Sequence, residues 1–353
     1  MFPKTSLSGA LKQLGFVQAD PIRSPARAQD LILRHRVSDY KAGDLETRYS
    51  KLKLEEDYLY AYGFVTHALW NILHPRPKVR LTTSEMRLFE VVSTHRKIHP
   101  RDLGAYFGQE REINAWGSYS KATTGILQTL HYRGVLRVAG RENGIRLYEP
   151  IVRQYEEVDP KERLTQLVLQ MADILGPLSV RSLNQVLNHL NYASPALSGN
   201  KSIVSRLLKA GELESAEVDE ITYVWCAHRA RRAQRNEVVR FLAPFDPVVW
   251  DRQRFEHLWG WAYRFEAYTP PAKRKLGYYA MPLSWRENVI GWVNISYKNG
   301  EMDVKPGFVD ARPMDSSFSL EFDSEIERFR EFLQKRSASH PRNRVSSLAG
   351  IAG

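Results

Sequence analysis

Cysteine is nearly absent from this sequence of 353 residues, in which Cys226 is the only one. A single cysteine excludes an intrachain disulfide and any cysteine-built zinc site, and it fits a reducing compartment. The sequence also has no run of about 18 apolar residues and no signal peptide, so we expect neither a membrane-spanning helix nor export. These absences together predict a cytoplasmic protein with no membrane partner.

Acidic residues are outnumbered by basic ones. The sequence has 40 Asp and Glu against 51 Lys and Arg, which gives a formal charge of +11 and a pI of about 9.6. Such an excess favours a polyanionic partner, most often a nucleic acid, although a generic basic surface would give the same balance. Hydrophobic residues make up 43% and charged residues 26%, as in ordinary globular proteins, and the length suits two to four small domains.

Helical and strand patterns are clearest between residues 84 and 150. Apolar spacing predicts a first helix over 86–92, a short second helix that begins at Pro100, and a third helix capped by Ser120. Alternating apolar residues on both sides of Asn143-Gly144 then predict a hairpin, because that dipeptide is a strong turn former. Three helices followed by a two-stranded hairpin are the pattern of a winged helix.

The third helix and the hairpin of this unit are basic. Lys121 and Arg133 lie on the predicted helix, and Arg137, Arg141 and Arg146 lie on the hairpin. A basic third helix beside a basic wing is suited to contacts with a DNA groove and its phosphates. We therefore expect these five residues to bind DNA.

The same order of elements recurs elsewhere in the chain. At 160–225 three apolar helical stripes precede a hairpin whose acidic residues would repel phosphate, so we expect a mainly structural unit. Residues 1–80 are interpreted as a less regular copy. Residues 241–310 instead hold dense Trp, Tyr and Pro and predicted strands at 277–282 and 289–295, before a closing helix over 318–333.

The predicted class is therefore α+β, with three tandem winged-helix domains and a C-terminal β-rich part. The expected domains are 1–80, 81–155, 156–227 and 228–337, followed by a disordered tail over 338–353. The tail is rich in Ser, Arg and Gly, a composition that buries too little apolar surface to fold.

A short polar motif near the N-terminus holds the candidate catalytic residues. Gln18 and Asp20 lie two apart between apolar neighbours, and residues i and i+2 of an extended segment point to the same side. A carboxylate beside an amide, which both donates and accepts, is suited to holding a water. A Gln-x-Asp before a proline is also typical of a turn with a solvated aspartate, so the motif alone leaves both interpretations open.

Several longer stretches connect this motif with a known family. They are Leu14-Gly15-Phe16-Val17-Gln18-Ala19-Asp20, Ala26-Arg27-Ala28, Thr66-His67-Ala68, Pro244-Phe245-Asp246-Pro247, Trp250-Asp251-Arg252, Leu258-Trp259-Gly260-Trp261, Glu266-Ala267-Tyr268, Lys273-Arg274 and Gly277-Tyr278-Tyr279. With these stretches, the chain resembles the YcaQ/AlkZ group of bacterial DNA glycosylases, which are built from tandem winged helices and unhook interstrand crosslinks. The resemblance covers most of residues 7–310. Members often carry an arginine after the glycine of the late strand, whereas Trp292 follows Gly291 here.

The resemblance implies both a shape and an activity. The family fold is a C-shape around a basic channel, and its members repair DNA in the bacterial cytoplasm, at the nucleoid. Gln18 and Asp20 match the Gln-x-Asp form of the family motif, which acts on a broader range of alkylated bases, and His67 becomes a candidate for a place near the lesion. We expect a monomeric, monofunctional glycosylase that hydrolyses the N-glycosidic bond of N7-alkylated purines and unhooks crosslinks in double-stranded DNA. The implied chemistry needs no metal and no cofactor.

Two other classes of function fit the same residues. A non-catalytic winged-helix regulator or DNA-protection protein would use the same basic surfaces and leave Asp20 as a turn residue. An RNA- or protein-binding scaffold would use the acidic hairpin instead. Excision of an alkylated base from a labelled duplex separates the enzyme from both.

Overall fold

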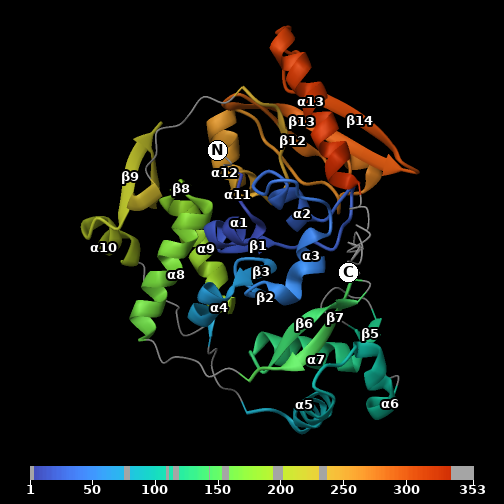
Figure 1. The fold of residues 1–353 in the computed structure, drawn as a ribbon. Coiled ribbons are helices and arrows are strands. Elements are labelled where there is room, and N and C mark those ends of the chain that lie inside the picture. Colours follow the sequence, from blue (N-terminus) through green and yellow to red (C-terminus); the bar gives the residue numbers. More distant parts are fainter. Residues whose placement is uncertain are drawn as a thin grey trace, which may run out of the picture.

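The computed structural model describes residues 4–74, 80–108, 111–113, 119–142, 144–152, 159–193, 202–229 and 237–334. The protein is α+β, and in the described part its strands form small antiparallel sheets with helices packed around them (Figure 1). The expected tail over 338–353 lies outside the described residues. None of the described helices is both long and apolar enough to cross a membrane.

The first unit carries the motif strand. Its elements are α1 (Leu7–Leu14), β1 (Phe16–Gln18), α2 (Ala28–Leu33), α3 (Asp44–Arg48), β2 (Leu54–Tyr58), β3 (Tyr62–Thr66) and α4 (His67–Leu73). The Ser6 hydroxyl accepts the Gly9 N–H at the start of α1, and Gly15 ends the helix at φ 66°, a conformation that favours glycine. The three strands form a sheet in the order β1-β3-β2.

The second unit follows the predicted order, with one difference. Its elements are α5 (Thr83–His95), η2 (Pro100–Leu103), α6 (Gly104–Phe107), β4 (Arg111–Ile113), β5 (Tyr119–Lys121), α7 (Ala122–Tyr132), β6 (Leu136–Glu142) and β7 (Ile145–Pro150). The prediction that Ser120 caps the third helix and that Lys121 lies on it was wrong. Ser120 pairs with Glu112 in the β4–β5 hairpin, so the backbone is still extended there and α7 begins at Ala122.

The third unit repeats the strand order of the first. Its elements are α8 (Pro160–Leu175), β8 (Leu178–Ser179), α9 (Val180–Ala193), α10 (Ile203–Lys209), β9 (Leu213–Val218), β10 (Ile221–Cys226) and η4 (Ala227–Arg229). Its sheet has the order β8-β10-β9, which is equivalent to β1-β3-β2. In the second unit an isolated bridge between Ile98 and Tyr148 takes the place of the first strand. Helix, strand, helix, helix and hairpin therefore recur three times.

The C-terminal region is built on a four-stranded antiparallel sheet of order β11-β12-β13-β14. Its elements are β11 (Arg240–Phe241), α11 (Pro247–Trp250), α12 (Arg252–Trp259), η5 (Pro271–Lys273), β12 (Met281–Trp285), β13 (Asn288–Lys298), β14 (Glu301–Phe308) and α13 (Ser316–Leu333). The predicted strand at 277–282 begins later than expected, because the Glu266 carboxylate binds the backbone N–H groups of Lys275, Leu276 and Gly277 and holds them in a loop.

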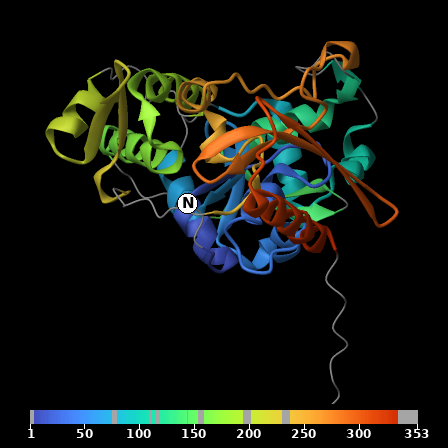
Figure 2. The same ribbon diagram turned by 90° about the horizontal axis from the view of Figure 1, so that it is seen from above.

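Two hydrophobic cores meet at β1. Val17 belongs to a core that the first unit shares with the C-terminal sheet and α13. Its neighbour Phe16 belongs to a second core, shared with the third unit. The second unit has a core of its own. Side chains alternate along a strand, so β1 is held on both sides. In two views the first unit lies between the second and third units (Figures 1 and 2).

Candidate active site

Gln18 is the last residue of β1 and pairs with Gly63 of β3. A Cβ atom at Gly63 would lie 2.4 Å from the Val17 carbonyl oxygen and 2.5 Å from the Phe16 ring, so only glycine allows this close pairing. The Oε1 atom of Gln18 is buried and has no hydrogen-bond partner among the described residues. A buried acceptor without a partner is costly in a folded protein, and it is suited to binding a water or a substrate group.

Asp20 follows two residues later in extended backbone. The Ala19 N–H donates to the Tyr62 carbonyl at 2.9 Å, which continues the pairing past the end of β1. Val17 and Ala19 both pack on the core shared with the C-terminal sheet. Alternation along an extended segment is the basis for expecting Gln18 and Asp20 to share a side, and that shared direction stays a prediction.

The Asp20 carboxylate is half-buried, and within the described ranges it makes no ion pair. The Ile22 N–H donates to its Oδ1 at 2.8 Å, which leaves Oδ2 for another partner. Burial raises the pKa of Asp20 above its ordinary value, and the hydrogen bond from Ile22 offsets only part of that rise. An ionised Asp20 is thus a poorly solvated anion, which favours interaction with a positive charge.

Tyrosines of the C-terminal region lie close to Asp20. The pKa values of Tyr268 and Tyr279 are both raised, first by burial and second by the negative charge of Asp20. The Tyr279 hydroxyl is buried without a hydrogen-bond partner in the described part of the chain. Tyr268 is 73% exposed and Tyr278 is 42% exposed. We call Tyr268, Tyr278 and Tyr279 the tyrosine wall.

The tyrosine wall is positioned by a buried carboxylate. Glu266 Oε2 accepts the N–H groups of Lys275, Leu276 and Gly277 at 2.8, 2.7 and 3.2 Å. Gly277 has φ 124°, and a Cβ atom there would lie 2.3 Å from the Asn294 side chain, so glycine is required at this position. The loop before Tyr278 and Tyr279 is therefore rigidly held.

Comparisons with known proteins identify the family of this chain. A family described as DNA glycosylase AlkZ-like matches residues 11–332. The chain belongs to the AlkZ-like family of DNA glycosylases. The matched residues include both the motif strand and the tyrosine wall. Membership gives the protein a DNA glycosylase role with DNA as substrate.

A solved structure shows the same fold. The Streptomyces sahachiroi DNA glycosylase AlkZ aligns with a TM-score of 0.61 at 15% sequence identity. The alignment covers 94% of this chain and 91% of that chain. The architecture is therefore shared along almost the whole length, although few side chains are the same.

The described contact of His67 in this AlkZ-like protein is with a carboxylate outside the motif. His67 begins α4, and its Nε2 lies 3.1 Å from Glu55 Oε1. Gln18 pairs with Gly63 of β3, whereas His67 follows the end of that strand. A place for His67 near the lesion stays a prediction, and its observed partner is a buried carboxylate of β2.

The basic wing of the second unit is engaged with that same strand. Arg141 donates to Glu56 through Nε at 2.8 Å and Nη2 at 2.6 Å, and Arg146 Nε lies 3.5 Å from Glu56 Oε2. Arg137 donates to Glu55 at 2.8 Å. These pairs join β6 and β7 to β2, so the three arginines hold the second unit on the first. Their expected DNA contacts stay a prediction.

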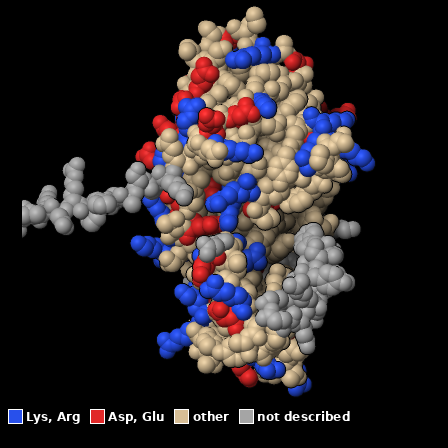
Figure 3. Space-filling view, turned by 90° about the vertical axis from the view of Figure 1, so that its right-hand side faces the viewer, with Lys and Arg blue, Asp and Glu red and all other residues tan. Residues whose placement is uncertain are grey.

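The other two predicted DNA-binding residues also have a different setting from the one expected. Arg133 Nη1 donates to Glu85 at 2.8 Å, within the second unit. Lys121 ends β5, and its side chain lies outside the described residues. On the face that Figure 3 shows, Lys and Arg side chains are interspersed with Asp and Glu. Net charge alone therefore does not mark the DNA-binding surface.

The acidic partners were missed from the sequence. Glu55, Glu56 and Asp57 are consecutive and all nearly fully buried. Burial alone would raise the pKa of Glu56, but Arg141 and Arg146 outweigh it and keep that pKa below its ordinary value. The sequence did hold one indication of these buried ion pairs, namely three successive carboxylates directly before an aromatic stretch. A buried strand tolerates such carboxylates only when cations pair with them.

Four exposed cations outside the wing differ from the wing arginines in having no ion-pair partner among the described residues. Arg23 is exposed three residues after Asp20, and Arg264, Lys273 and Lys275 are exposed in the segment that carries the tyrosine wall. Within the described ranges none of these four side chains forms an ion pair. They can therefore meet phosphates at no cost in broken ion pairs.

Proposed function

We propose that the protein hydrolyses the N-glycosidic bond of N7-alkylated purines in double-stranded DNA, with Asp20 and Gln18 at the catalytic water. The observation that carries this is the Asp20 carboxylate: half-buried, without an ion pair among the described residues, and next to exposed tyrosines. Asp20 also accepts the Ile22 N–H as a turn residue does, but a turn requires neither its burial nor its nearness to tyrosines. A regulator would need no anion at this place.

The chemistry follows from the lesion. An N7-alkylated purine is cationic and leaves C1′ with the bonding electron pair as a neutral base, so no strong general acid is needed. The sugar develops oxocarbenium character, which a nearby carboxylate stabilises. Asp20 also orients the water that adds to C1′ and takes up its proton, and the free Gln18 oxygen accepts the second hydrogen of that water. The products are a free base and an abasic site.

The tyrosine wall would bind the base. A cationic purine is attracted to an aromatic face, and base stacking on an aromatic side chain contributes about 1–3 kcal/mol. Tyr268 and Tyr278 are exposed rather than enclosed, which suits a lesion that cannot be withdrawn from the helix. Unhooking of interstrand crosslinks is therefore part of the proposal, because a crosslinked base obstructs full flipping.

The mechanism is proposed to be monofunctional. The Gln18–Asp20 motif contains no lysine, so it offers no amine for a covalent imine with the sugar. Arg23, Arg264, Lys273 and Lys275 would instead hold the phosphates that flank the lesion. Hydrolysis then leaves the strand intact.

Product analysis tests the proposal. Duplexes that carry one N7-methylguanine or one nitrogen-mustard crosslink are incubated with the protein. The expected result is release of the alkylated base and strand breakage only after alkali. Intact substrate at saturating protein would reject the glycosylase activity on these lesions, and a borohydride-stable protein–DNA adduct would reject the monofunctional mechanism.

A further inference from the structure

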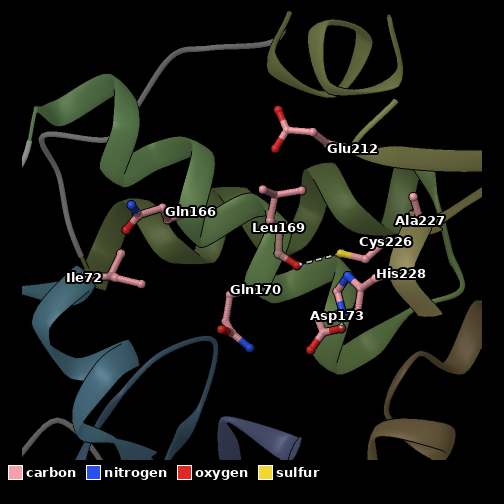
Figure 4. A pocket seen from close by; sticks show the side chains of 9 residues that line it. All are labelled: Ile72, Gln166, Leu169, Gln170, Asp173, Glu212, Cys226, Ala227 and His228. Atoms are coloured by element: carbon pink, nitrogen blue, oxygen red, sulfur yellow. Dashed lines mark hydrogen bonds and ion pairs between the residues drawn. The ribbon is translucent and has the colours of Figure 1, made fainter. Parts of the chain in front are cut away.

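A second polar cluster lies in the third unit, outside the candidate active site. It consists of Asp173 on α8, Cys226 at the end of β10 and His228 in η4 (Figure 4). One ligand atom of each residue lies within 4.8 Å of those of the other two. His228 Nε2 is 2.9 Å from Asp173 Oδ1, and the Cys226 thiol donates to the Leu169 carbonyl at 3.2 Å.

The cluster borders a cavity of about 520 Å³. Gln166, Gln170 and Glu212 also line it, so polar groups other than the three proposed ligands border the cavity. The Asp173 side chain is 16% exposed and Cys226 is 2% exposed, whereas the His228 side chain is 69% exposed. Two of the three groups are thus fixed by packing, and the third is free to adjust.

We propose that Asp173, Cys226 and His228 form a site for a divalent metal of the zinc class. Sulfur, imidazole nitrogen and carboxylate oxygen are together a donor set that Zn²⁺ and Co²⁺ accept and that Mg²⁺ and Ca²⁺ do not favour. Tetrahedral zinc places such atoms about 3.3–3.6 Å apart, and the three ligand atoms lie within 4.8 Å of one another, so closure requires movement of at most about 1 Å, which the exposed His228 can supply. The cavity leaves a fourth position for water.

The single cysteine does not argue against this site. A zinc site built from cysteines is excluded by composition, but a mixed site takes only one thiolate. Binding displaces the thiol proton that now points to Leu169 and requires a neutral His228 with Nε2 unprotonated. No electron transfer is involved.

The position of the site gives it a structural consequence. A bound metal would connect α8, β10 and η4, which otherwise meet in the second core, through the His228–Asp173 ion pair and through the Cys226 hydrogen bond. On α8, Gln170 lies one turn before Asp173 and packs against Gly15, where a Cβ atom would be 2.8 Å from its Nε2. Gly15 precedes the motif strand β1. The metal would therefore stiffen the helix that supports this strand.

Cobalt titration of the metal-free full-length protein tests the site. The expected result is one Co²⁺ per chain with a thiolate-to-cobalt charge-transfer band, which Zn²⁺ then removes by displacement. Asp173→Asn and His228→Ala should each weaken binding at least about 10-fold, and Cys226→Ala should abolish the band. His189→Ala, at an exposed histidine of the same unit, should bind as the wild type does.

A second pair of measurements, made first on the wild type, tests the site even if one of these variants does not fold. Zinc should slow alkylation of Cys226 by iodoacetamide in the wild type and should raise its unfolding temperature, with neither effect in His228→Ala. The proposal is wrong if no charge-transfer band forms, if His228→Ala binds cobalt as tightly as His189→Ala, or if zinc leaves the alkylation rate unchanged.

Discussion

Replacement of Arg141 by alanine separates a structural role of the basic wing from a DNA-binding one. Arg141 makes two hydrogen bonds to Glu56, a side chain that is 1% exposed, and donates Nη1 to the Gly144 carbonyl at 2.9 Å. Loss of one partner from a buried ion pair costs about 3–5 kcal/mol, because the other charge stays buried. Here Arg146 at 3.5 Å and the Tyr62 hydroxyl at 2.8 Å still face Glu56, so we expect about 2–3 kcal/mol.

Urea unfolding and a salt titration of DNA binding are the assays. Arg101→Ala is the matched control, because Arg101 is an arginine of the same unit, is 64% exposed, and among the described residues forms ion pairs only with the surface carboxylates of Asp102 and Glu142. It should change stability by no more than about 0.5 kcal/mol. Arg141→Ala should leave the dependence of DNA affinity on salt unchanged. If Arg141→Ala left stability unaltered and reduced the slope of log DNA affinity against log salt concentration by about one unit, the structural role would be refuted. Arg141 would then be a phosphate contact.

The remaining predictions concern pH and the proposed DNA surface. Because the pKa of Glu56 is lowered, its ion pairs stabilise the fold at pH values above its ordinary pKa of 4.5. This stability should be lost as the pH falls through the lowered pKa. Acid unfolding of wild type and Glu56→Gln is the measurement, and the wild type should lose its advantage over the variant in this pH range. Lys273→Ala and Lys275→Ala should each reduce the salt slope by about one unit, and unchanged slopes would place the phosphates elsewhere. Tyr268→Ala should weaken binding of lesion DNA about 10-fold while Tyr268→Phe retains it, and equal affinities would remove stacking from the account.

Much of the fold could be predicted from local pattern. The apolar stripes of α8 and α9 and the alternating strands β6 and β7 are strong periodic features, so the helices and hairpins were placed within a few residues. The start of the third helix was wrong because Ser120 is both a good cap and a residue of a hairpin, and only strand pairing decides between the two.

The long-range contacts could not be predicted in this way. The pairs between Glu56 and Arg141 join residues 85 positions apart, and nothing in either local stretch names its partner. The wing arginines were therefore interpreted as free cations. The tyrosine wall was missed for the same reason, since Asp20 and Tyr268 approach only when the C-terminal region packs on β1. The i/i+2 spacing of Gln18 and Asp20 is a local feature that the sequence shows directly, and the shared direction of the two side chains stays a prediction.

The pH dependence of excision reports on the same carboxylate. Burial raises the pKa of Asp20, so a proton binds the folded protein more tightly and the ionised form is the less stable one. The protonated form of Asp20 therefore adds to the stability of the fold at pH values below the ordinary pKa of an aspartate. This contribution is lost as the pH rises through the raised pKa of Asp20 in the folded protein. Asp20→Asn should therefore leave stability at neutral pH unchanged or higher, and the activity of the wild type should fall in acid as Asp20 takes up a proton.

Single-turnover excision of N7-methylguanine by wild type and Asp20→Asn, measured beside DNA affinity, tests the central claim most directly. The substitution keeps the size of the side chain and the hydrogen bond from Ile22 but removes the charge that the developing oxocarbenium needs. Asp310→Asn, at an exposed aspartate of the C-terminal region, is the matched control and should behave as the wild type does. We predict that Asp20→Asn lowers the rate about 10²–10³-fold with unchanged DNA affinity. An excision rate equal to that of the wild type would contradict the assignment of Asp20 as the catalytic carboxylate.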